Sequence, residues 1–509
     1  MNPFHQLNAW IDRTAMYHLV LGMLGILALC SVVTAFVGLA GSTGIEQVLS
    51  LVVVILSAYL MSLVCAWSTG IAANHHSSII TGLIIFFLVM PGTTILEYAF
   101  LSATVVMAIA SKYILVYRGQ HMVNPAAFAV VVLALSGYGV ATWWVATPWL
   151  FIPLVITGTI VVMKIRRAVP VVAFLATGFL VYMFEGLAAG NGVMDWSAFW
   201  ISYPALFLGF FMLTEPFTMP PTKRLQGIYG VMVGVLANAS IASTFVSVTP
   251  ELALLIGNVI MYPSTLRRKL FLTFESKQEI AMGTWEFIFT KPPTMVFKAG
   301  QYLEWMLPHK KADTRGIRRY FTIASAPTEE TLRLALKVPE KASSFKQRIK
   351  DLAPGDVVVA SQLAGDFLLP RDARKKIAMV AGGIGVTPFR SHIKTALDTY
   401  ATTQRDPLDT ILFYCNNTKA DAAYGALWSE AETVLPFKLV SIFAKEPADA
   451  TYETGYFSAD IVRRRAPDFL DRTWYVSGPP PMVNATVKTL RALGVPQRKI
   501  VQDFFPGLA

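Results

Sequence analysis

The chain has 509 residues, of which 54% are hydrophobic and 15% are charged, whereas soluble domains carry about 25% charged residues. Its formal net charge is +11, but no basic run with interleaved aromatic residues occurs, which argues against a nucleic-acid-binding protein. The three cysteines lie far apart in the sequence, which excludes an iron–sulfur cluster or a zinc site held by clustered thiolates of this chain.

Residues 1–266 resemble a membrane protein in composition, because they hold only 8 of the 43 Lys and Arg residues. A membrane span needs about 20 apolar residues, and ten apolar segments in this part are candidates. The predicted spans are centred near Gly25, Leu56, Phe86, Val106, Leu133, Ile156, Ala176, Phe207, Val233 and Leu255.

The charges between these segments predict an orientation. With the N-terminus inside, all eight cations fall in inner segments, and the five outer loops carry acidic residues instead. This distribution satisfies the positive-inside rule. The first fifteen residues lack a cleavable-signal pattern, so the first apolar segment is expected to remain as a helix. We therefore expect a multi-pass protein of the cell inner membrane, with its N-terminus and its C-terminal part in the cytoplasm.

The pattern changes after residue 266. Alternating segments such as "TLRLALKV" predict β-strands, and after Lys375 apolar strands such as "KIAMVAG" and "TILFYCNN" alternate with helical stretches. The predicted architecture is a polytopic α-helical domain (1–266), a β-barrel domain (267–372) and an α/β nucleotide-binding domain (373–509).

A series of motifs runs through the last two domains: "RRYFTIASAP", "LALKVPEKASSF", "PGDVVVASQLAGDF", "AGGIGVTPF", "YVSGPPPMV" and the terminal "QDFFPGLA". In order and spacing, the region from Leu270 to Ala509 resembles the ferredoxin–NADP reductase superfamily. The resemblance implies an FAD-binding barrel, an NAD(P)-binding domain, and a flavin-dependent NAD(P)H oxidoreductase.

The resemblance places the FAD-binding residues in the first two motifs. Arg319 would offer its fork of donors to the flavin pyrophosphate. The Thr322 hydroxyl would reach the flavin ring, which makes Thr322 a candidate catalytic residue as well. The sequence departs from the family where Ala342 replaces the usual glycine. The implied FAD-binding set is Arg319, Tyr320, Phe321, Thr322, Lys337, Ser343 and Ser344.

The later motifs are implied to bind the nicotinamide dinucleotide, because glycines let the backbone approach its phosphates. Ser477 stands where the family has a cysteine beside the nicotinamide, and it is a candidate catalytic residue. Phe505 is either the aromatic residue that shields the flavin or a core residue. The implied dinucleotide-binding set is Gly382, Gly383, Gly385, Thr387, Pro388, Gly478 and Pro479. The choice between NADH and NADPH stays open, although Lys419 without a neighbouring arginine favours NADH.

The first half resembles the flavin-bearing membrane subunits of the sodium-pumping NADH:quinone oxidoreductase and of the Rnf complex. The resemblance covers Val20 to Ile260 and rests on ten spans, the Asn-Pro-Ala turn at Asn124 and the Thr-x-Pro segment at Thr214. It makes both residues candidate cofactor ligands, although Asn124 is equally well a helix cap. The family's motif for covalent flavin attachment is missing, so non-covalent FMN or riboflavin, or a quinone, is the expected membrane occupant.

The favoured function is a membrane-bound NAD(P)H dehydrogenase that passes electrons through FAD to a membrane flavin or a quinone. A transmembrane reductase that delivers electrons to an outer acceptor is the alternative, and its haem form would need histidines paired across two spans. Only His5, His18, His75, His76 and His121 occur in the first half, without that spacing. A redox sensor or scaffold is a third reading. Further membrane subunits and ion coupling stay open.

Overall fold

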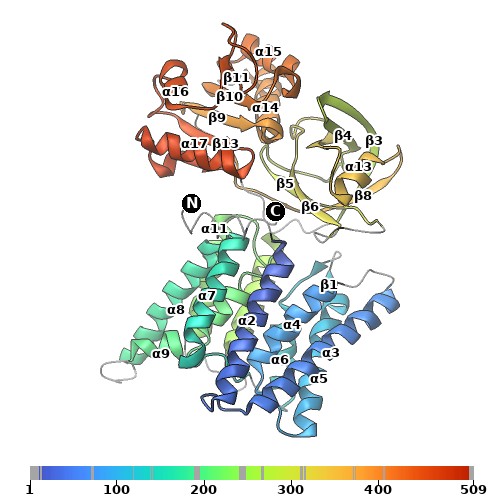
Figure 1. Cartoon of the computed structure of the whole chain (residues 1–509), viewed down its shortest axis with the longest axis vertical. Coiled ribbons are helices and arrows are strands. Elements are labelled where there is room, and N and C mark those ends of the chain that lie inside the picture. Colours follow the sequence, from blue (N-terminus) through green and yellow to red (C-terminus); the bar gives the residue numbers. More distant parts are fainter. Residues whose placement is uncertain are drawn as a thin grey trace. The chain divides into compact units, whose positions relative to one another are not determined.

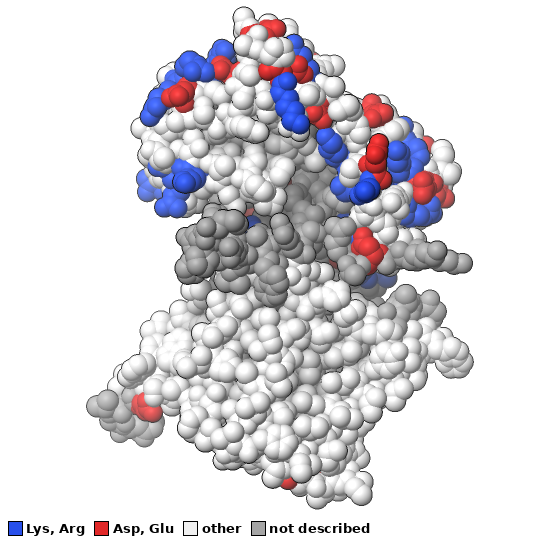
Figure 2. Space-filling model, viewed as in Figure 1, with Lys and Arg blue, Asp and Glu red and all other residues white. Residues whose placement is uncertain are grey.

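The computed structural model describes residue 11 and residues 14–69, 74–117, 120–137, 139, 141–188, 195–239, 248–264, 269–309, 313, 317–370, 372, 374–404 and 407–503. The chain divides into two compact units at the boundary between Arg267 and Arg268 (Figure 1). Charged side chains cover much of the second unit, and few are visible on the helices of the first (Figure 2).

The N-terminal unit is helical, and each of the ten predicted centres lies in one of its helical elements. Its helices are α2 (Met16–Phe36), α3 (Gly44–Thr69), α4 (His75–Leu88), α5 (Ile95–Ile114), α6 (Pro125–Leu135), α7 (Pro148–Ile165), α8 (Ala168–Ala188), α9 (Trp196–Ile201), α10 (Ala205–Phe207), the π-helix η1 (Leu208–Met212), α11 (Lys223–Asn238) and α12 (Pro250–Met261). A short hairpin precedes α6, and it consists of the two-residue strands β1 (Val116–Tyr117) and β2 (Gln120–His121).

The predicted count of ten spans is not confirmed. Among the described residues, five helices are long and apolar enough to cross a membrane: α2, α3, α5, α7 and α8. The helices α4 and α6 are apolar but shorter, and the eighth segment is divided between α9, α10 and η1. A bilayer core is about 30 Å thick, so helices of this shorter length do not cross it alone.

Local sequence determines where several of these helices begin. Thr94 caps α5, and Glu97 bonds back to the capping residue, which forms a capping box. Asn124 caps α6 by accepting a hydrogen bond from the Ala127 amide at 3.1 Å, and Pro125 occupies the first helical position. The turn predicted at Asn-Pro-Ala is therefore a helix start.

The C-terminal unit begins with a six-stranded antiparallel sheet in the order β6-β5-β8-β3-β4-β7. Large apolar side chains such as Phe274, Phe287 and Trp305 fill its core. Its elements are β3 (Leu270–Ala281), β4 (Thr284–Thr290), β5 (Tyr302–Met306), β6 (Arg318–Thr322), β7 (Thr331–Lys337), α13 (Ser344–Lys350) and β8 (Val357–Ala364).

The predicted barrel is not closed, because no strand ladder joins β6 to β7 in the described part of the sheet. A single backbone hydrogen bond, from the Ala324 amide to the Arg333 carbonyl at 2.9 Å, links the two edges. The carbonyl groups that follow β6 are bonded elsewhere: Ala324 and Ser325 accept from Arg390 and Ser391.

The second part of the unit is a parallel six-stranded sheet in the order β12-β11-β10-β9-β13-β14, as the α/β pattern predicts. Alternate residues of β9 face opposite sides: Met379 packs with α14 and α15, and Val380 packs with α16 and α17 (Figure 1). Its elements are β9 (Ile377–Gly382), α14 (Thr387–Thr403), β10 (Thr410–Asn416), α15 (Gly425–Val434), β11 (Phe437–Phe443), β12 (Glu453–Thr454), α16 (Ala459–Arg465), β13 (Thr473–Ser477), α17 (Pro480–Ala492) and β14 (Ile500–Gln502).

Candidate active site

Strand β6 presents two buried polar side chains among its five residues, Arg319 and Thr322. The Thr322 hydroxyl oxygen is buried and has no hydrogen-bond partner within the described part of the chain. A buried unpaired hydroxyl is costly, so this atom is suited to a ligand that can bond to it. The Tyr320 hydroxyl is bonded to Gln362 at 3.1 Å, and the Phe321 ring lies 5.7 Å from that of Phe345.

The residues predicted to hold the flavin pyrophosphate lie close together. Arg319 forms an ion pair with the Asp313 carboxylate at 2.9 Å, and the Asp313 amide donates to the Ser344 hydroxyl at 3.0 Å. Ser343 is the N-cap of α13. Arg319 and Ser344 thus contact the same residue, and the Arg319 guanidinium is paired with its carboxylate.

The two glycine turns predicted to bind the dinucleotide meet at the carboxyl edge of the parallel sheet. Ser477 at the end of β13 is paired with Ala381 of β9. A Cβ atom on Gly385 would lie 2.6 Å from the Gly478 Cα atom, so the two turns are in backbone contact. Gly383 has φ +51°, which favours glycine.

The other residues of the predicted dinucleotide site lie beside these turns. Gly382 closes β9, Pro479 precedes α17, and Thr387 and Pro388 open α14. The sheet therefore brings the whole predicted set to one edge, which is where doubly wound folds bind dinucleotides.

The candidate catalytic Ser477 is buried, and its hydroxyl donates to the Asp503 carboxylate at 3.1 Å. The Asp503 amide in turn donates to the Val476 carbonyl at 2.9 Å. The predicted Phe505 lies outside the described residues. Burial raises the pKa of the Cys415 thiol to about 12, so this thiol is protonated at neutral pH and supplies no thiolate to the site.

Lys337 lies at the end of β7 and forms an ion pair with Asp421 of the parallel-sheet domain at 2.8 Å. Lys419, the cation weighed for NADPH selectivity, lies 3.9 Å from the Asp449 carboxylate and 4.5 Å from the centre of the Tyr452 ring. Its charge is thus already partnered.

Sequence reasoning missed Asn416. This residue ends β10 at the same edge as the glycine turns and is 8% exposed. A buried amide at this edge is suited to a dinucleotide hydroxyl. The only signal in the sequence was its place at the end of the second apolar strand of the α/β pattern.

The two predicted ligands in the helical unit are bonded within the protein. Thr214 donates to the Phe210 carbonyl at 2.7 Å. The Asn124 amide nitrogen donates to the Met212 carbonyl at 3.4 Å, while its backbone amide donates to Asn258 at 2.9 Å. Asn258 also donates to the Tyr229 hydroxyl at 2.7 Å. Asn124 therefore links α6 to η1 and α12, and its role as a ligand stays a prediction.

The described histidines of the helical unit contact aromatic neighbours, and His5 lies outside the described residues. The His18 and His76 rings lie 4.6 Å apart, and His75 lies 4.6 Å from the Tyr59 ring. His121 bonds to the Glu215 carboxylate at 3.1 Å. In the described ranges no group of three or more His, Cys, Asp or Glu side chains is arranged to hold a metal ion.

A cavity of about 510 Å³ lies at the opposite edge of the parallel sheet, where β10 and β11 begin, and is lined by residues that include Asp409, Phe437 and Arg472. Arg472 is paired there with Asp409 at 2.9 Å and with Asp468 at 2.7 Å. This cavity is therefore separate from the edge that carries the glycine turns, and its two lining arginines, Arg465 and Arg472, are both paired with carboxylates.

Comparison with known proteins finds oxidoreductase relatives of the C-terminal unit. Residues 379–488 match the model of the oxidoreductase NAD-binding domain. The chain is 29% identical over 245 residues to the aromatic O-demethylase reductase subunit of an Amycolatopsis species, a match that covers 47% of this chain and 70% of that protein. It is 26% identical over 220 residues to a flavohemoprotein of Xylella fastidiosa, with 42% and 52% covered. It also matches NADH-cytochrome b5 reductase 1 of Rattus norvegicus at 33% identity over 128 residues, with 24% and 41% covered.

The chain spans about half the length of the flavohemoproteins it matches. Among solved structures, it is similar to that of Amycolatopsis cytochrome P450 reductase GcoB, with a TM-score of 0.40, 25% identity, and 47% and 70% of the two chains covered. The chain thus contains an oxidoreductase NAD-binding domain. The family model and the reductase relatives support an oxidoreductase.

Proposed function

We propose that this protein is a membrane-bound NAD(P)H dehydrogenase that passes electrons from NAD(P)H through FAD to a membrane flavin or a quinone. The observation that supports it is the presence in one chain of an oxidoreductase NAD-binding domain and five helices long and apolar enough to cross a membrane. The helical domain would comprise residues 1–266, the FAD-binding domain 267–372 and the NAD(P)-binding domain 373–509.

The residues of the antiparallel-sheet domain fit FAD. Arg319 and Ser344 would bind the pyrophosphate, which would replace or share their contacts with Asp313. The Thr322 hydroxyl, which has no hydrogen-bond partner among the described residues, would bond to the flavin ring. The Gly385 and Gly478 turns, in backbone contact, would let the dinucleotide phosphates approach. When bound, FAD accepts two electrons together as hydride and releases them one at a time.

The protein's own groups have limited chemical tasks in this proposal. Thr322 donates a hydrogen bond, the buried Arg319 neutralises phosphate charge, and Ser477, held by Asp503, packs beside the nicotinamide. We further propose that NADH is the preferred donor, because Lys419 is paired with Asp449 and the nearby Asn416 is neutral. A ribose 2′-phosphate requires free cations at this place.

The acceptor is proposed from the resemblance of the helical half to flavin-bearing membrane subunits. We propose non-covalent FMN or riboflavin, or a quinone, at the helical unit, and an inner-membrane location with the reductase domains in the cytoplasm. Asn124 and Thr214 remain candidate ligands. Their hydrogen bonds at the junction of α6, α12 and η1 would have to open or be shared for a ligand to bind there.

The decisive experiment is the cofactor content and acceptor use of the detergent-solubilised chain. We expect FAD, with or without FMN or riboflavin, to be released on denaturation, and NADH oxidation to be coupled to quinone reduction. Arg319→Ala should lower the FAD content, because the pyrophosphate loses its guanidinium partner. A haem absorbance band, or a chain that holds no FAD, would contradict the proposal and favour the transmembrane alternative or a non-catalytic role.

A further inference from the structure

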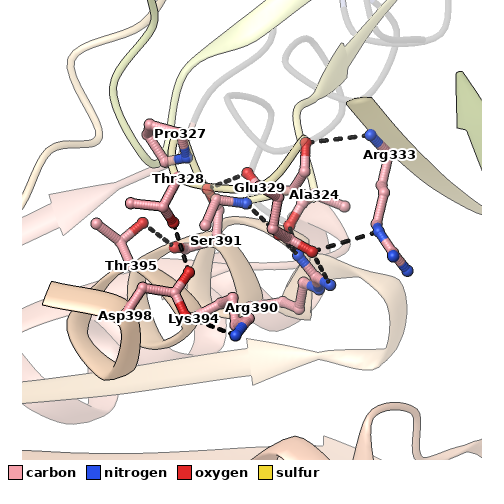
Figure 3. Close-up of polar contacts among 12 residues, drawn as sticks. Ala324, Pro327, Thr328, Glu329, Arg333, Arg390, Ser391, Lys394, Thr395 and Asp398 are labelled. Atoms are coloured by element: carbon pink, nitrogen blue, oxygen red, sulfur yellow. Dashed lines mark hydrogen bonds and ion pairs between the residues drawn. The ribbon is translucent and has the colours of Figure 1, made fainter. Parts of the chain in front are cut away.

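The two sheets of the C-terminal unit are joined by a buried ion pair that no cofactor motif contains. Arg390, in the first turn of α14, donates both terminal guanidinium nitrogens to the Glu329 carboxylate, one of them at 2.9 Å, and one also donates to the Ala324 carbonyl at 3.1 Å (Figure 3). Arg390 is 7% exposed, and the Glu329 side chain is 12% exposed. Bidentate pairs of this kind fix orientation as well as charge.

Ser391, the residue after Arg390, makes a second hydrogen bond between the two sheets. Ser391 is fully buried and donates its hydroxyl to the Ser325 carbonyl at 2.7 Å (Figure 3). Ala324 and Ser325 lie two and three residues after Thr322, and Arg390 and Ser391 lie two and three residues after Pro388. The backbone directly after the predicted flavin strand is therefore bonded to the helix directly after the predicted phosphate turn.

A second layer of charges supports the pair. Arg333 contacts Glu329 at 3.3 Å and Glu286 at 2.8 Å. Glu286, which is 1% exposed, accepts a hydrogen bond from the Tyr424 hydroxyl at 2.9 Å. The Arg390 guanidinium lies 5.7 Å from the centre of the Tyr424 ring. Two cations and two carboxylates thus balance each other at the junction of the two domains.

This arrangement differs from an ordinary surface ion pair. Exposed pairs contribute little and tolerate movement, whereas a desolvated network of several charged hydrogen bonds has few alternative geometries. The same interface also carries an exposed bond, from the Thr328 hydroxyl to Asp398 at 2.5 Å, which lacks those constraints. The buried contacts of Arg390 and Ser391 can therefore fix the separation of the two sheets, whereas the exposed Thr328–Asp398 bond cannot.

On the basis of the proposed function, we propose that Arg390, Glu329 and Ser391 are positioning residues that set the separation of nicotinamide and flavin for hydride transfer. They touch neither group. They act by holding the segment after Thr322 against α14, so that the flavin strand and the phosphate turn keep one spacing. Transfer of hydride depends steeply on such spacing, since an error of about 1 Å can cost a hundredfold in rate.

The test uses Arg390→Met, Glu329→Gln and Ser391→Ala in the full-length, FAD-loaded protein. Two quantities are measured: the rate of flavin reduction at saturating NADH, and the long-wavelength absorbance band that appears when NAD⁺ stacks on the reduced flavin. We expect FAD content to stay at the wild-type level, the rate to fall at least tenfold in Arg390→Met, and the band to weaken in all three variants. Arg390→Lys should recover only part of the rate, because lysine lacks the planar fork.

Thr328→Ala is the matched control, because it removes a bond across the same interface outside the buried group, and its rate and band should equal those of the wild type. A wild-type rate and band in FAD-loaded Arg390→Met would overturn the proposal. If Arg390→Met fails to fold or to hold FAD, the two milder variants decide, and unchanged bands in both would overturn it. A wild-type chain whose flavin NAD(P)H does not reduce would instead overturn the proposed function and this inference with it.

Discussion

The Thr322 hydroxyl gives a prediction in which stability and activity respond differently. Because this oxygen is buried without a hydrogen-bond partner in the described part of the chain, Thr322→Val should leave the free energy of unfolding of the flavin-free protein unchanged or raise it by about 1–2 kcal/mol. Flavin reduction by NADH should slow about tenfold or more, because one donor to the reacting ring is lost. Thermal unfolding and stopped-flow absorbance measure the two effects.

Thr322→Ser is the matched control for that prediction, because it keeps the hydroxyl and loses only a methyl group. Its rate should stay close to the wild-type rate. A large loss of stability in Thr322→Val, with no change in rate, would mean that the hydroxyl has a structural partner and no role at the flavin.

A second residue, His392, predicts a dependence of stability on pH. Burial lowers its pKa from 6.5 to about 4, although the hydrogen bond to the Phe367 carbonyl opposes the shift. Between these pH values the unfolded chain binds more protons than the folded one. The contribution of the neutral His392 to the free energy of unfolding is therefore fully present above pH 6.5 and is lost as the pH falls to 4. The full shift corresponds to about 3 kcal/mol.

His392→Gln isolates this effect, because Asp421 and Asp468, whose pKa values are lowered, titrate in both proteins. The unfolding temperature of the wild type should fall more steeply than that of His392→Gln between pH 6.5 and pH 4. Parallel pH profiles would show that His392 does not control acid stability.

At the scale of elements, the contact between the two glycine turns predicts a strict requirement. In Gly385→Ala, the added Cβ would lie 2.6 Å from the Gly478 Cα atom. The clash is with backbone atoms, so no flexible side chain can move to relieve it. We expect NADH binding to weaken at least about tenfold, or ~1.4 kcal/mol, as measured by titration of the flavin-loaded protein. Gly425→Ala, at the start of α15 in open space, should bind NADH normally.

The elements themselves were largely predictable, because apolar alternation and glycine turns report local backbone structure directly. The parallel sheet and the shared edge of its glycine turns follow from the pattern of β9, β10 and β13. The sequence did not predict the open edge between β6 and β7, nor the π-helix at Leu208–Met212. The segment after β6 is bonded to α14, 66 residues further along the chain, and periodicity does not report such contacts.

The candidate site divides in the same way. Arg319, Thr322 and the glycines lie in recognisable local motifs, and the fold brings them to two strand ends. Glu329 and Arg390, 61 residues apart in the sequence, were not predicted, because each alone looks like a surface charge. A pair that is buried only when two domains meet leaves no signal in either segment.

At the scale of the whole molecule, the charge distribution predicts sidedness. Inside-out membrane vesicles should oxidise added NADH at once, whereas right-side-out vesicles should do so only after detergent is added, because the reductase domains would face the cytoplasm. Equal activity in both preparations, with the vesicles shown to be sealed, would contradict the predicted orientation.

The central position of β9 has a consequence for how the protein is made. All six residues of β9 are buried. One edge of β9 pairs with β10, and the other pairs with β13, which begins only at Thr473. A nascent chain therefore carries an unpaired apolar strand edge until Thr473–Ser477 has been synthesised, which is a state prone to intermolecular pairing. Premature termination before Thr473 should give insoluble or rapidly degraded protein, and slow synthesis at low temperature should improve the yield of intact chain.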